Sequence, residues 1–380
     1  MTTFHSLTSD LERHIEQAIL KAGGWIGFDV FMAQALYTPG LGYYANDSTK
    51  FGVLPYVTQD GVRVAGSDFV TAPEMTPLFG WSLAQQVAQA LQVTQTHEIW
   101  EFGAGSGALA LQILQALQAQ GVALPRYTIV DLSGSLRARQ QVTLAAFAAH
   151  VRWVDALPDT LHGVVLGNEL LDAMPVKLLA RLNGRWHERG VTLAQEVPAG
   201  ALRFTWQDRP TDLQPPYEIL GEHDYLTETH AQAESFIRTL GDKLLCGAVF
   251  LLDYGFPEAE YFHPQRHMGT LMCHQAHQVD ADPLVEVGKK DITAHVNFTG
   301  IALAGNAAGL DVLGYCNQAR FLMNCGLLKQ LEAADLPTRV MAQKLIMEHE
   351  MGEFFKVIGF YKGEPWEAMG FSHGDKTHTL

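Results

Sequence analysis

Residues 98–108 read Glu98-Ile-Trp-Glu-Phe-Gly-Ala-Gly-Ser-Gly-Ala108, and this stretch decides the fold. A short apolar run comes first, and glycines follow at alternate positions, Gly103, Gly105 and Gly107. The next residues, 109–117, repeat leucine at helical spacing. A strand, a glycine turn and a helix in this order open a nucleotide-binding α/β unit. Glycine allows the tight turn, and the helix N-terminus directs unpaired N–H groups toward a ligand.

The glycine spacing alone leaves the ligand open. Gly103, Gly105 and Ala108 also satisfy the dinucleotide pattern G-x-G-x-x-G/A. Glu101 argues against a dinucleotide, because its carboxylate would repel a pyrophosphate nearby. S-adenosylmethionine has no phosphate and carries a sulfonium and an ammonium, which a carboxylate attracts. The stretch resembles the first motif of Rossmann-like methyltransferases, acid-x-G-x-G-x-G, and we favour that interpretation over a nicotinamide or flavin site or a purely structural turn.

Length and composition indicate a globular protein of one elaborated domain or two. The 380 residues are 47% hydrophobic and 18% charged, which are globular values. The formal net charge of −15 argues against non-specific binding of nucleic acid, which needs a basic surface. A solvated acidic surface or a cationic partner fits this charge better.

Cysteine use and the first residues suggest where the protein resides. The four cysteines show neither a C-x-x-C pair nor the spacing of a disulfide framework. The start, Met-Thr-Thr-Phe-His, has no signal or transit character, and no apolar run approaches the ~20 residues of a membrane helix. We therefore expect a soluble cytoplasmic protein that binds no membrane. A homodimer is considered as its assembly.

Two domains are expected. A capping box at residues 9–12 opens a helix that Gly23 and Gly24 end, and residues 28–37 form a second helix. Residues 1–65 are therefore an N-terminal helical lobe that precedes the sheet, and residues 66–380 are the core. An insertion at about 177–228 is β-rich, because Asn183-Gly184 predicts a hairpin and residues 202–206 a third strand.

Several acids and their neighbours follow the predicted strands. Asp131 ends the second strand, where such folds bind ribose hydroxyls, and Asp155 ends the third, within reach of an adenine amine. A plain helix-start or loop acid is the structural alternative for each. Residues 71–74 either start a helix at 78–91 or form a loop over the cofactor. The predicted cofactor-binding set is Thr71, Pro73, Glu74, Glu101, Gly103, Ala104, Gly105, Gly107, Asp131, Leu132, Asp155, Asn168 and Glu169.

Asn168 and Glu169 follow the fourth strand, 163–168, and Asp253 ends the fifth, 248–253. Parallel sheets bind ligands outside the carboxyl ends of their strands, so chemistry is expected there. Glu169 and Asp172 share a face if the turn between them is helical. Later strands are expected at 269–274 and 354–361, with apolar helices running from about residue 298 to residue 351.

Six separated stretches resemble one family in order and spacing, the MidA-like methyltransferases. They are residues 66–74, 101–107, 130–133, 168–176, 253–255 and 269–298. The resemblance covers roughly residues 25–360 and implies a Rossmann-like class I methyltransferase sheet of the α/β class. It also implies S-adenosyl-L-methionine as donor, S-adenosyl-L-homocysteine as product and, by analogy with the mitochondrial complex I assembly factors of the family, a protein arginine as acceptor. Val70, Ala72 and Asn297 depart from the family pattern, which usually has two hydroxyl residues and an aspartate there.

An arginine acceptor is difficult chemically, because its guanidinium is protonated at working pH. Carboxylates can pair with it bidentately and leave one nitrogen directed at the methyl group. Glu169, Asp172 and Asp253 are therefore the predicted catalytic residues, and a capped turn and a strand-end acid are their structural alternatives. Two other functions remain open: a non-catalytic assembly factor that binds the donor, and a nicotinamide-dependent oxidoreductase, for which Asp131 lies later than expected.

His263, His267, His274 and His277 lie near Cys273 in the sequence. Such residues can bind zinc, but Pro264 breaks the helix that would align the first two. No metal site is therefore predicted.

Overall fold

The computed structural model describes residues 2–46, 56–57, 63–64, 71–131, 133–194, 204–275 and 278–380. The chain forms two compact units, and each is built from segments that lie far apart in the sequence. The first unit comprises Met1–Thr49, Asp172–Ala233 and Glu258–Asn297. The second comprises Lys50–Leu171, Glu234–Pro257 and Phe298–Leu380.

The second unit holds the large sheet, whose strands run in the order β17-β18-β12-β7-β4-β5-β6. β4 to β7 and β12 are parallel, whereas β18 is antiparallel to both β12 and β17. The sequence order reverses between β4 and β7, and α/β sheets bind ligands outside the carboxyl ends of the strands at such a point. This confirms the predicted Rossmann-like class. The bounds are β4 Glu98–Phe102, β5 Arg126–Val130, β6 Val151–Val154, β7 Leu161–Asn168, β12 Leu244–Phe256, β17 Asp311–Asn317 and β18 Phe355–Lys362.

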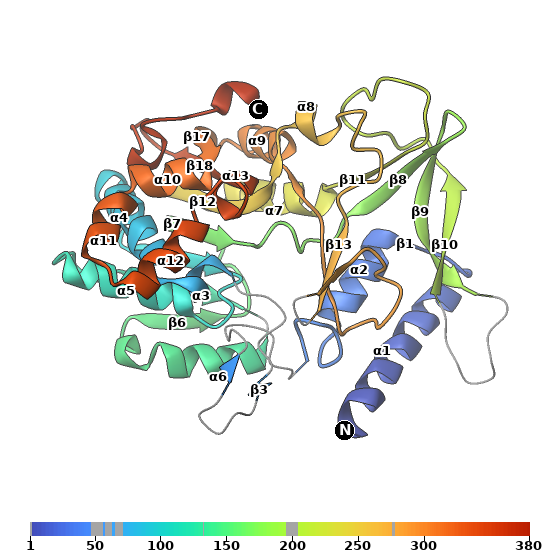
Figure 1. Ribbon diagram of the computed structural model, residues 1–380, viewed down its shortest axis with the longest axis horizontal. Helices are drawn as coiled ribbons and strands as arrows, with labels where there is room; N and C mark the ends of the chain where they lie inside the picture. The colour runs from blue at the N-terminus through green and yellow to red at the C-terminus, as the bar shows by residue number, and fades with distance from the viewer. Residues whose placement is uncertain are drawn as a thin grey trace. The chain divides into compact units, whose positions relative to one another are not determined.

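Helices cover both faces of this sheet (Figure 1). Side chains alternate between the faces of a strand, and Leu166 and Phe250 point into the core that contains α4 (Pro77–Thr94), α5 (Ala108–Ala119) and α10 (Gln318–Asn324). On the opposite face, Phe236 of α7 (Ala231–Lys243) packs edge-on against Phe102, with ring centroids 5.1 Å apart. α9 (Phe298–Ala307) approaches Phe360 so closely that only Gly305 fits there. The remaining elements are β2 Tyr56–Val57, β3 Arg63–Val64, α3 Ala72–Met75, α6 Gly134–Thr143, η1 Ala145–Phe147, α11 Leu327–Ala333, α12 Leu336–Lys344, α13 Met351–Phe354, η2 Met369–Phe371 and η3 Thr377–Thr379.

The first unit is organised around an antiparallel sheet in the order β1-β9-β8-β11, with β10 pairing to β9. β8 and β1 share one edge of β9, because β8 pairs with residues 185–189 and β1 with residues 190–191. The helices α1 (Thr2–Lys21) and α2 (Phe28–Tyr37) pack against β9 (Figure 1). The other bounds are β1 Ile26–Gly27, β8 Lys177–Leu182, β9 Arg185–Leu193, β10 Phe204–Pro210, β11 Tyr225–Thr229, α8 Glu258–Tyr261, β13 Met272–Gln275, β14 Gln278–Asp280, β15 Asp291–Thr293 and β16 Val296–Asn297.

One predicted element was wrong, and one strand was not predicted. The N-terminal segment adds a strand to its two helices, because Ile26 and Gly27 pair with β9, and a strand of two residues is too short to leave a sequence pattern. Residues 311–317 form β17, although helices were expected there. A short apolar run between two helices has no period that separates strand from helix. The division at residues 65 and 66 stays a prediction.

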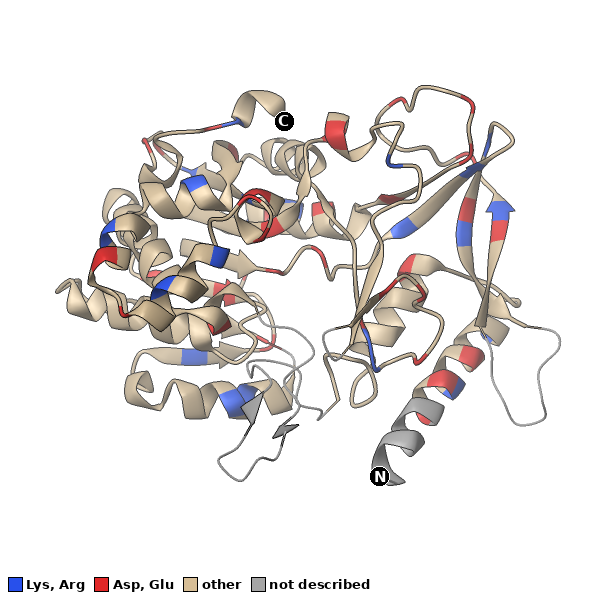
Figure 2. Ribbon diagram, viewed as in Figure 1, with Lys and Arg blue, Asp and Glu red and all other residues tan. Residues whose placement is uncertain are grey.

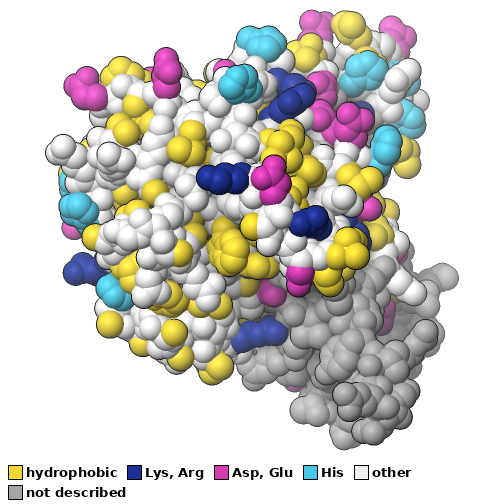
Figure 3. All heavy atoms as spheres, turned by 60° about the vertical axis from the view of Figure 1, so that its left-hand side comes forward, with side chains coloured by type: hydrophobic (Ala, Val, Ile, Leu, Met, Phe, Trp, Pro, Cys, Tyr) yellow, Lys and Arg dark blue, Asp and Glu magenta, His cyan; other side chains and the backbone are white. Residues whose placement is uncertain are grey.

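Charged and apolar side chains are mixed on the surface. Lys and Arg residues of the described elements lie scattered among Asp and Glu residues (Figure 2). The face turned forward in Figure 3 carries hydrophobic side chains interspersed with charged side chains and histidines. Scattered apolar residues of this kind are normal for a globular protein. Within the described residues, no helix is both long enough and apolar enough to cross a membrane.

Candidate functional site

The glycine turn adopts the predicted geometry. Gly103, Gly105 and Gly107 have φ angles of +67°, +53° and +85°, in the left-handed region. Glycine enters this region without strain, whereas a larger residue would add backbone strain at each of the three positions. β4 ends directly before the turn and α5 begins directly after it, which leaves backbone N–H groups at the carboxyl edge of the sheet.

Gln140 of α6 joins this turn to the end of β5. Its Nε2 donates to the carbonyl of Gly105 at 3.0 Å and to Oδ2 of Asp131 at 2.8 Å, and its Oε1 accepts from Trp153 Nε1 at 2.8 Å. The residue is fully buried. Gln140 was not among the predicted site residues, because one glutamine in a mostly polar helix gives no signal until the fold is known.

Asp131 lies beside the turn, as predicted from its position after the second strand. Its Oδ1 accepts from the Ser133 amide at 2.9 Å, while Oδ2 accepts from Gln140. Burial raises the pKa of this carboxyl, and the two hydrogen bonds and Arg137 partly offset that rise. The carboxylate is therefore held in one orientation at the strand end. Leu132 lies outside the described residues.

Glu101 is buried at the penultimate position of β4, with 2% of its surface exposed. The Tyr127 hydroxyl donates to its Oε2 at 2.8 Å. Burial raises the pKa of Glu101 to about 7, the bond from Tyr127 lowers it, and the charge of Asp131 raises it further. A cation bound nearby would favour the ionised form.

The predicted residues of α3 are tied to the same turn. Glu74 accepts a hydrogen bond from the Ser106 hydroxyl, and the Pro73 carbonyl accepts from Gln112 Nε2 at 2.7 Å. The Thr71 carbonyl accepts from the Glu74 amide at 2.9 Å, which closes the start of α3. Ser106 lies just before α5, and Gln112 lies in its first half. The structure therefore brings residues 71–74 next to the glycine turn.

Asp155 pairs with Arg137, and 72% of its side chain is exposed. Arg137 also donates to the Asp131 carbonyl at 3.1 Å, so the ends of β5 and β6 are linked. The contact with an adenine amine stays a prediction.

Glu169 follows β7 in a strained conformation. Its φ of +49° is uncommon for a residue with a side chain and costs of order 1–3 kcal/mol. Its amide donates to the Leu252 carbonyl at 2.9 Å, and its Oε1 accepts from Asn168 Nδ2 at 3.0 Å. The segment that follows is a non-helical turn, so the condition under which Glu169 and Asp172 would share a helix face is not met. The left-handed residue itself breaks the helical path.

Asp253, near the end of β12, holds the backbone of this turn through hydrogen bonds. It is 1% exposed, and its Oδ2 accepts from the amides of Leu170 and Leu171 at 3.0 and 2.8 Å. Its Oδ1 accepts from the Tyr254 amide at 3.0 Å. These bonds suit a residue that positions the backbone after Glu169, and a direct contact of Asp253 with a substrate stays a prediction.

Asp172 is the first residue of the second segment of the first unit and is 5% exposed. Its carbonyl accepts from the Ala294 amide at 2.9 Å.

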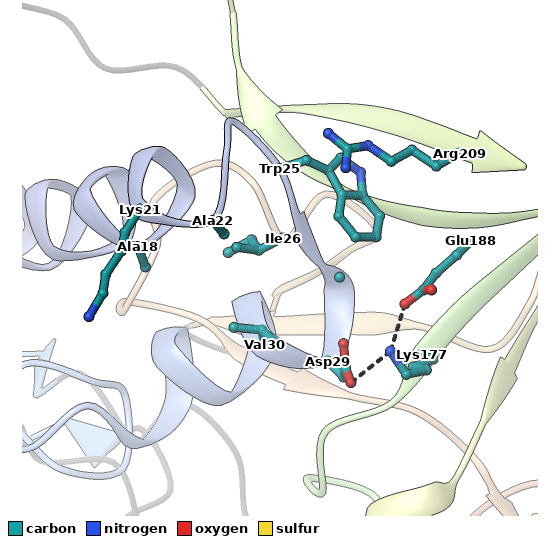
Figure 4. Close-up of a pocket in the computed structure, with 11 residues that line it drawn as sticks. Ala18, Lys21, Ala22, Trp25, Ile26, Asp29, Val30, Lys177, Glu188 and Arg209 are labelled. Carbon is teal, nitrogen blue, oxygen red and sulfur yellow. Dashed lines mark hydrogen bonds and ion pairs between the residues drawn. The ribbon is translucent and has the colours of Figure 1, made fainter. Parts of the chain in front are cut away.

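A separate hollow of about 610 Å³ lies in the first unit (Figure 4). Lys177 sits on one side between Asp29 and Glu188, with N–O distances of 3.1 and 2.6 Å. The Arg209 guanidinium lies over the Trp25 ring, with its Cζ atom 4.6 Å from the ring centroid. None of the predicted site residues lines this hollow among the residues described.

Among the described residues, no group of three or more His, Cys, Asp or Glu side chains is arranged to hold a metal ion. His223 and His267 make an edge-on ring contact at 6.1 Å, and His223 Nε2 lies 3.0 Å from the Pro264 carbonyl. Of the four histidines that lie near Cys273 in the sequence, His267 makes this ring contact, and His277 lies outside the described residues.

Comparisons with known proteins converge on one family of proteins. A family model described as "Putative S-adenosyl-L-methionine-dependent methyltransferase" matches residues 82–316. A crystal structure of a Burkholderia thailandensis protein bound to S-adenosyl-homocysteine has a TM-score of 0.92 and 48% identity, covering 100% of this chain and 99% of that chain. The mitochondrial protein arginine methyltransferase NDUFAF7 of Danio rerio is 26% identical over 398 residues, with 93% of this chain and 88% of the relative covered. Its Drosophila melanogaster homolog is 25% identical over 412 residues, covering 95% and 88%.

Proposed function

This chain belongs to a family of S-adenosyl-L-methionine-dependent methyltransferases, and from that premise we propose that it methylates an arginine side chain of a protein. The donor is S-adenosyl-L-methionine and the product is S-adenosyl-L-homocysteine. The names of the Danio rerio and Drosophila melanogaster relatives support an arginine acceptor, because the chain covers most of each.

The residues around the glycine turn fit this donor. The buried carboxylate of Glu101 suits a ligand with two positive groups, and Asp131 is oriented to accept hydrogen bonds from ribose hydroxyls. The left-handed glycines leave the backbone accessible to an adenosine ligand. When bound, the donor supplies an electrophilic methyl group on its sulfonium.

The observation that carries the arginine proposal is Glu169, held in a left-handed conformation at the carboxyl end of β7. Transfer forms a nitrogen–carbon bond as the carbon–sulfur bond breaks, and the acceptor nitrogen then loses a proton. The guanidinium must lie in line with the breaking bond, so catalysis here is mainly orientation. The Glu169 carboxylate, oriented by the hydrogen bond from Asn168, can pair with two guanidinium nitrogens and leave the third nitrogen directed at the methyl group.

Asp253 and Asp172 have supporting parts in this proposal. Asp253 holds the amides of Leu170 and Leu171 and so keeps the turn after Glu169 in shape. Asp172 is the second candidate to pair with the acceptor.

The test is a methylation assay on cell lysate with isotope-labelled donor, read by mass spectrometry of the labelled peptides. We expect label on arginine nitrogens of protein. The matched control is Gly105→Val, which should abolish donor binding, because a β-branched side chain cannot adopt a φ of +53° without strain. Label on another residue type or on small molecules would contradict the arginine acceptor. Donor binding without any turnover would favour a non-catalytic assembly factor.

We also propose a location and an assembly for the protein. A cytoplasmic location rests on composition and cysteine use, and fractionation of cells tests it. A homodimer would appear in sedimentation as a mass twice the chain's 41.9 kDa.

A further inference from the structure

Residues 172 and 173, which follow Glu169 by three and four positions, are held by contacts within the first unit. Tyr37, the last residue of α2, donates from its hydroxyl to the Ala173 carbonyl at 2.8 Å. The neighbouring carbonyl, that of Asp172, accepts from the Ala294 amide at 2.9 Å. Two consecutive carbonyls are therefore fixed from two different parts of the chain.

A second tyrosine joins these two anchors. Tyr44 stacks on Tyr37, with ring centroids 5.6 Å apart and an angle of 21° between the planes. Its hydroxyl donates at 2.7 Å to Oδ1 of Asp291, the first residue of β15. β15 ends at Thr293 and is followed directly by Ala294, so the contacts close a circuit from α2 back to the Asp172 carbonyl.

The hydroxyls, rather than the rings, are the specific part of this arrangement. Tyr37 leaves 43% of its surface exposed, so a large apolar ring is not needed there to fill a core. Burial of the hydroxyls raises the pKa of Tyr37 and of Tyr44, and the nearby charge of Asp291 raises both further. Both hydroxyls therefore stay protonated and remain hydrogen-bond donors at any working pH.

These anchors matter because the segment is short. Glu169 precedes Asp172 by three residues, and a residue of chain spans at most ~3.6 Å. Residues 170 and 171 are held by Asp253, and residues 172 and 173 by the first-unit anchors. A left-handed glutamate persists only where its surroundings fix the backbone on both sides.

We propose that Tyr37 and Tyr44 are positioning residues for methyl transfer. Tyr37 fixes the backbone at Ala173, and Tyr44 acts through Asp291 on the strand that holds Asp172. Together they keep Glu169 in the conformation that orients the acceptor. This inference rests on the proposed role of Glu169 toward a guanidinium.

The test compares Tyr37→Phe with a matched control in the same unit. Tyr225 is buried, and its hydroxyl also donates to a backbone carbonyl, that of His263, at 3.1 Å. Tyr225→Phe therefore removes the same kind of bond elsewhere. Three quantities are measured on the full-length proteins: amide hydrogen exchange of residues 169–174, the unfolding temperature, and methyl transfer into lysate protein at varied donor concentration.

We expect Tyr37→Phe to speed exchange in residues 169–174 and to lower the rate at saturating donor about tenfold, the loss that corresponds to ~1.4 kcal/mol. Its KM for the donor and its unfolding temperature should stay close to those of Tyr225→Phe, which keeps normal exchange and turnover. Tyr44→Phe should show the same pattern more weakly, and it serves as the second variant if Tyr37→Phe folds poorly.

Unchanged exchange in residues 169–174, or faster exchange with full turnover, overturns the positioning role. A raised KM for the donor with a normal rate at saturation also overturns it, because the tyrosines would then serve the donor site. If the natural protein itself transferred no methyl group to lysate protein, the proposed methylation would be contradicted, and the role of Glu169 and of the two tyrosines would fall with it.

Discussion

At the scale of single residues, Glu169 combines strain with a predicted role, and two substitutions separate them. Glu169→Gln keeps the side-chain shape and removes the charge, so turnover should fall by about two orders of magnitude or more, equal to ~2.7 kcal/mol or more of transition-state stabilisation. Glu169→Gly should be equally inactive yet more stable by up to ~1 kcal/mol, because glycine accepts a φ of +49° without strain. Labelled-methyl transfer and thermal unfolding measure the two effects.

Donor affinity, measured by calorimetry, is the control for both variants and should change little. If Glu169→Gln lost donor binding in a folded protein, Glu169 would be a cofactor residue and Asp172 the next candidate for the acceptor. Undiminished turnover would exclude both roles.

Glu101 should make donor binding depend on pH. Its pKa of about 7, raised by burial, means that the carboxyl becomes neutral as pH falls below that value. A neutral carboxyl attracts a cation less, so affinity for S-adenosyl-L-methionine should weaken by up to about tenfold per pH unit below pH 7.

Calorimetry between pH 5.5 and about pH 8 measures this dependence, with Glu101→Gln as the comparison. Protonation of the ligand itself changes the affinity of the natural protein and of Glu101→Gln alike. Protonation of Glu101 changes the affinity of the natural protein only. Identical pH profiles would show that Glu101 does not sense the ligand's charge.

The residues that the sequence could predict are those that motifs carry. Gly103, Gly105 and Gly107 have the left-handed conformations their spacing indicates, and Asp131 lies beside them at the end of β5. Other features depend on contacts between distant segments and have no local pattern. The two hydrogen bonds to Oδ2 of Asp253 come from amides 82 and 83 residues away in the sequence.

At the scale of elements, Gln140 ties α6 to the glycine turn, because its Nε2 donates to both the Gly105 carbonyl and the Asp131 carboxylate. Gln140→Leu keeps a similar volume and leaves the Gly105 carbonyl and the Asp131 carboxylate without that donor. Loss of hydrogen bonds of this kind costs ~1–3 kcal/mol, so donor affinity should fall roughly tenfold or more.

The matched control for this prediction is Gln318→Leu. Gln318 is also fully buried, and its Nε2 donates to the Leu345 carbonyl at 3.0 Å. Both variants should lower the unfolding temperature, but calorimetry should find weaker donor binding only for Gln140→Leu. Equal affinities would mean that the bridge by Gln140 does not shape the donor site.

Elements with strong periodicity or turn chemistry were predictable. The helix expected at 28–37 is α2 as the structure has it, and Asn183-Gly184 forms the hairpin turn with φ angles of +50° and +75°. The errors fall where tertiary contacts decide. β17 is a strand because β18 pairs with it, and the turn after Glu169 is not helical because Asp253 holds its amides.

At the scale of the whole molecule, segments of the two units alternate along the sequence, and the chain crosses from one unit to the other five times. The pairing of β1 with β9 is one result, joining residue 26 to residue 191. A Cβ added at Gly190 would lie 2.2 Å from the Ile26 carbonyl oxygen and 2.4 Å from the Trp25 ring. Gly190→Ala should therefore destabilise the first unit by ~1–3 kcal/mol or more through overpacking.

Thermal unfolding measures this loss, with Gly134→Ala as the control, because a Cβ at Gly134 meets no atom within 4 Å. The control should be neutral or slightly stabilising at the start of α6. If Gly190→Ala were as stable as the control, the close contact between β1 and β9 would not exist in solution.

This alternation of segments also determines when each unit can fold while the chain is being synthesised. A chain leaves the ribosome from its N-terminus, and domains generally fold as they become complete. β1 leaves early but must wait for β9, and the first unit lacks its last segment until residue 297 has been synthesised. β18 lies between β12 and β17, so the large sheet closes only when residues 355–362 arrive. The first unit can therefore be complete once residue 297 has emerged, whereas the large sheet of the second unit has to wait for residues 355–362, and its earlier strands must avoid wrong pairings until then.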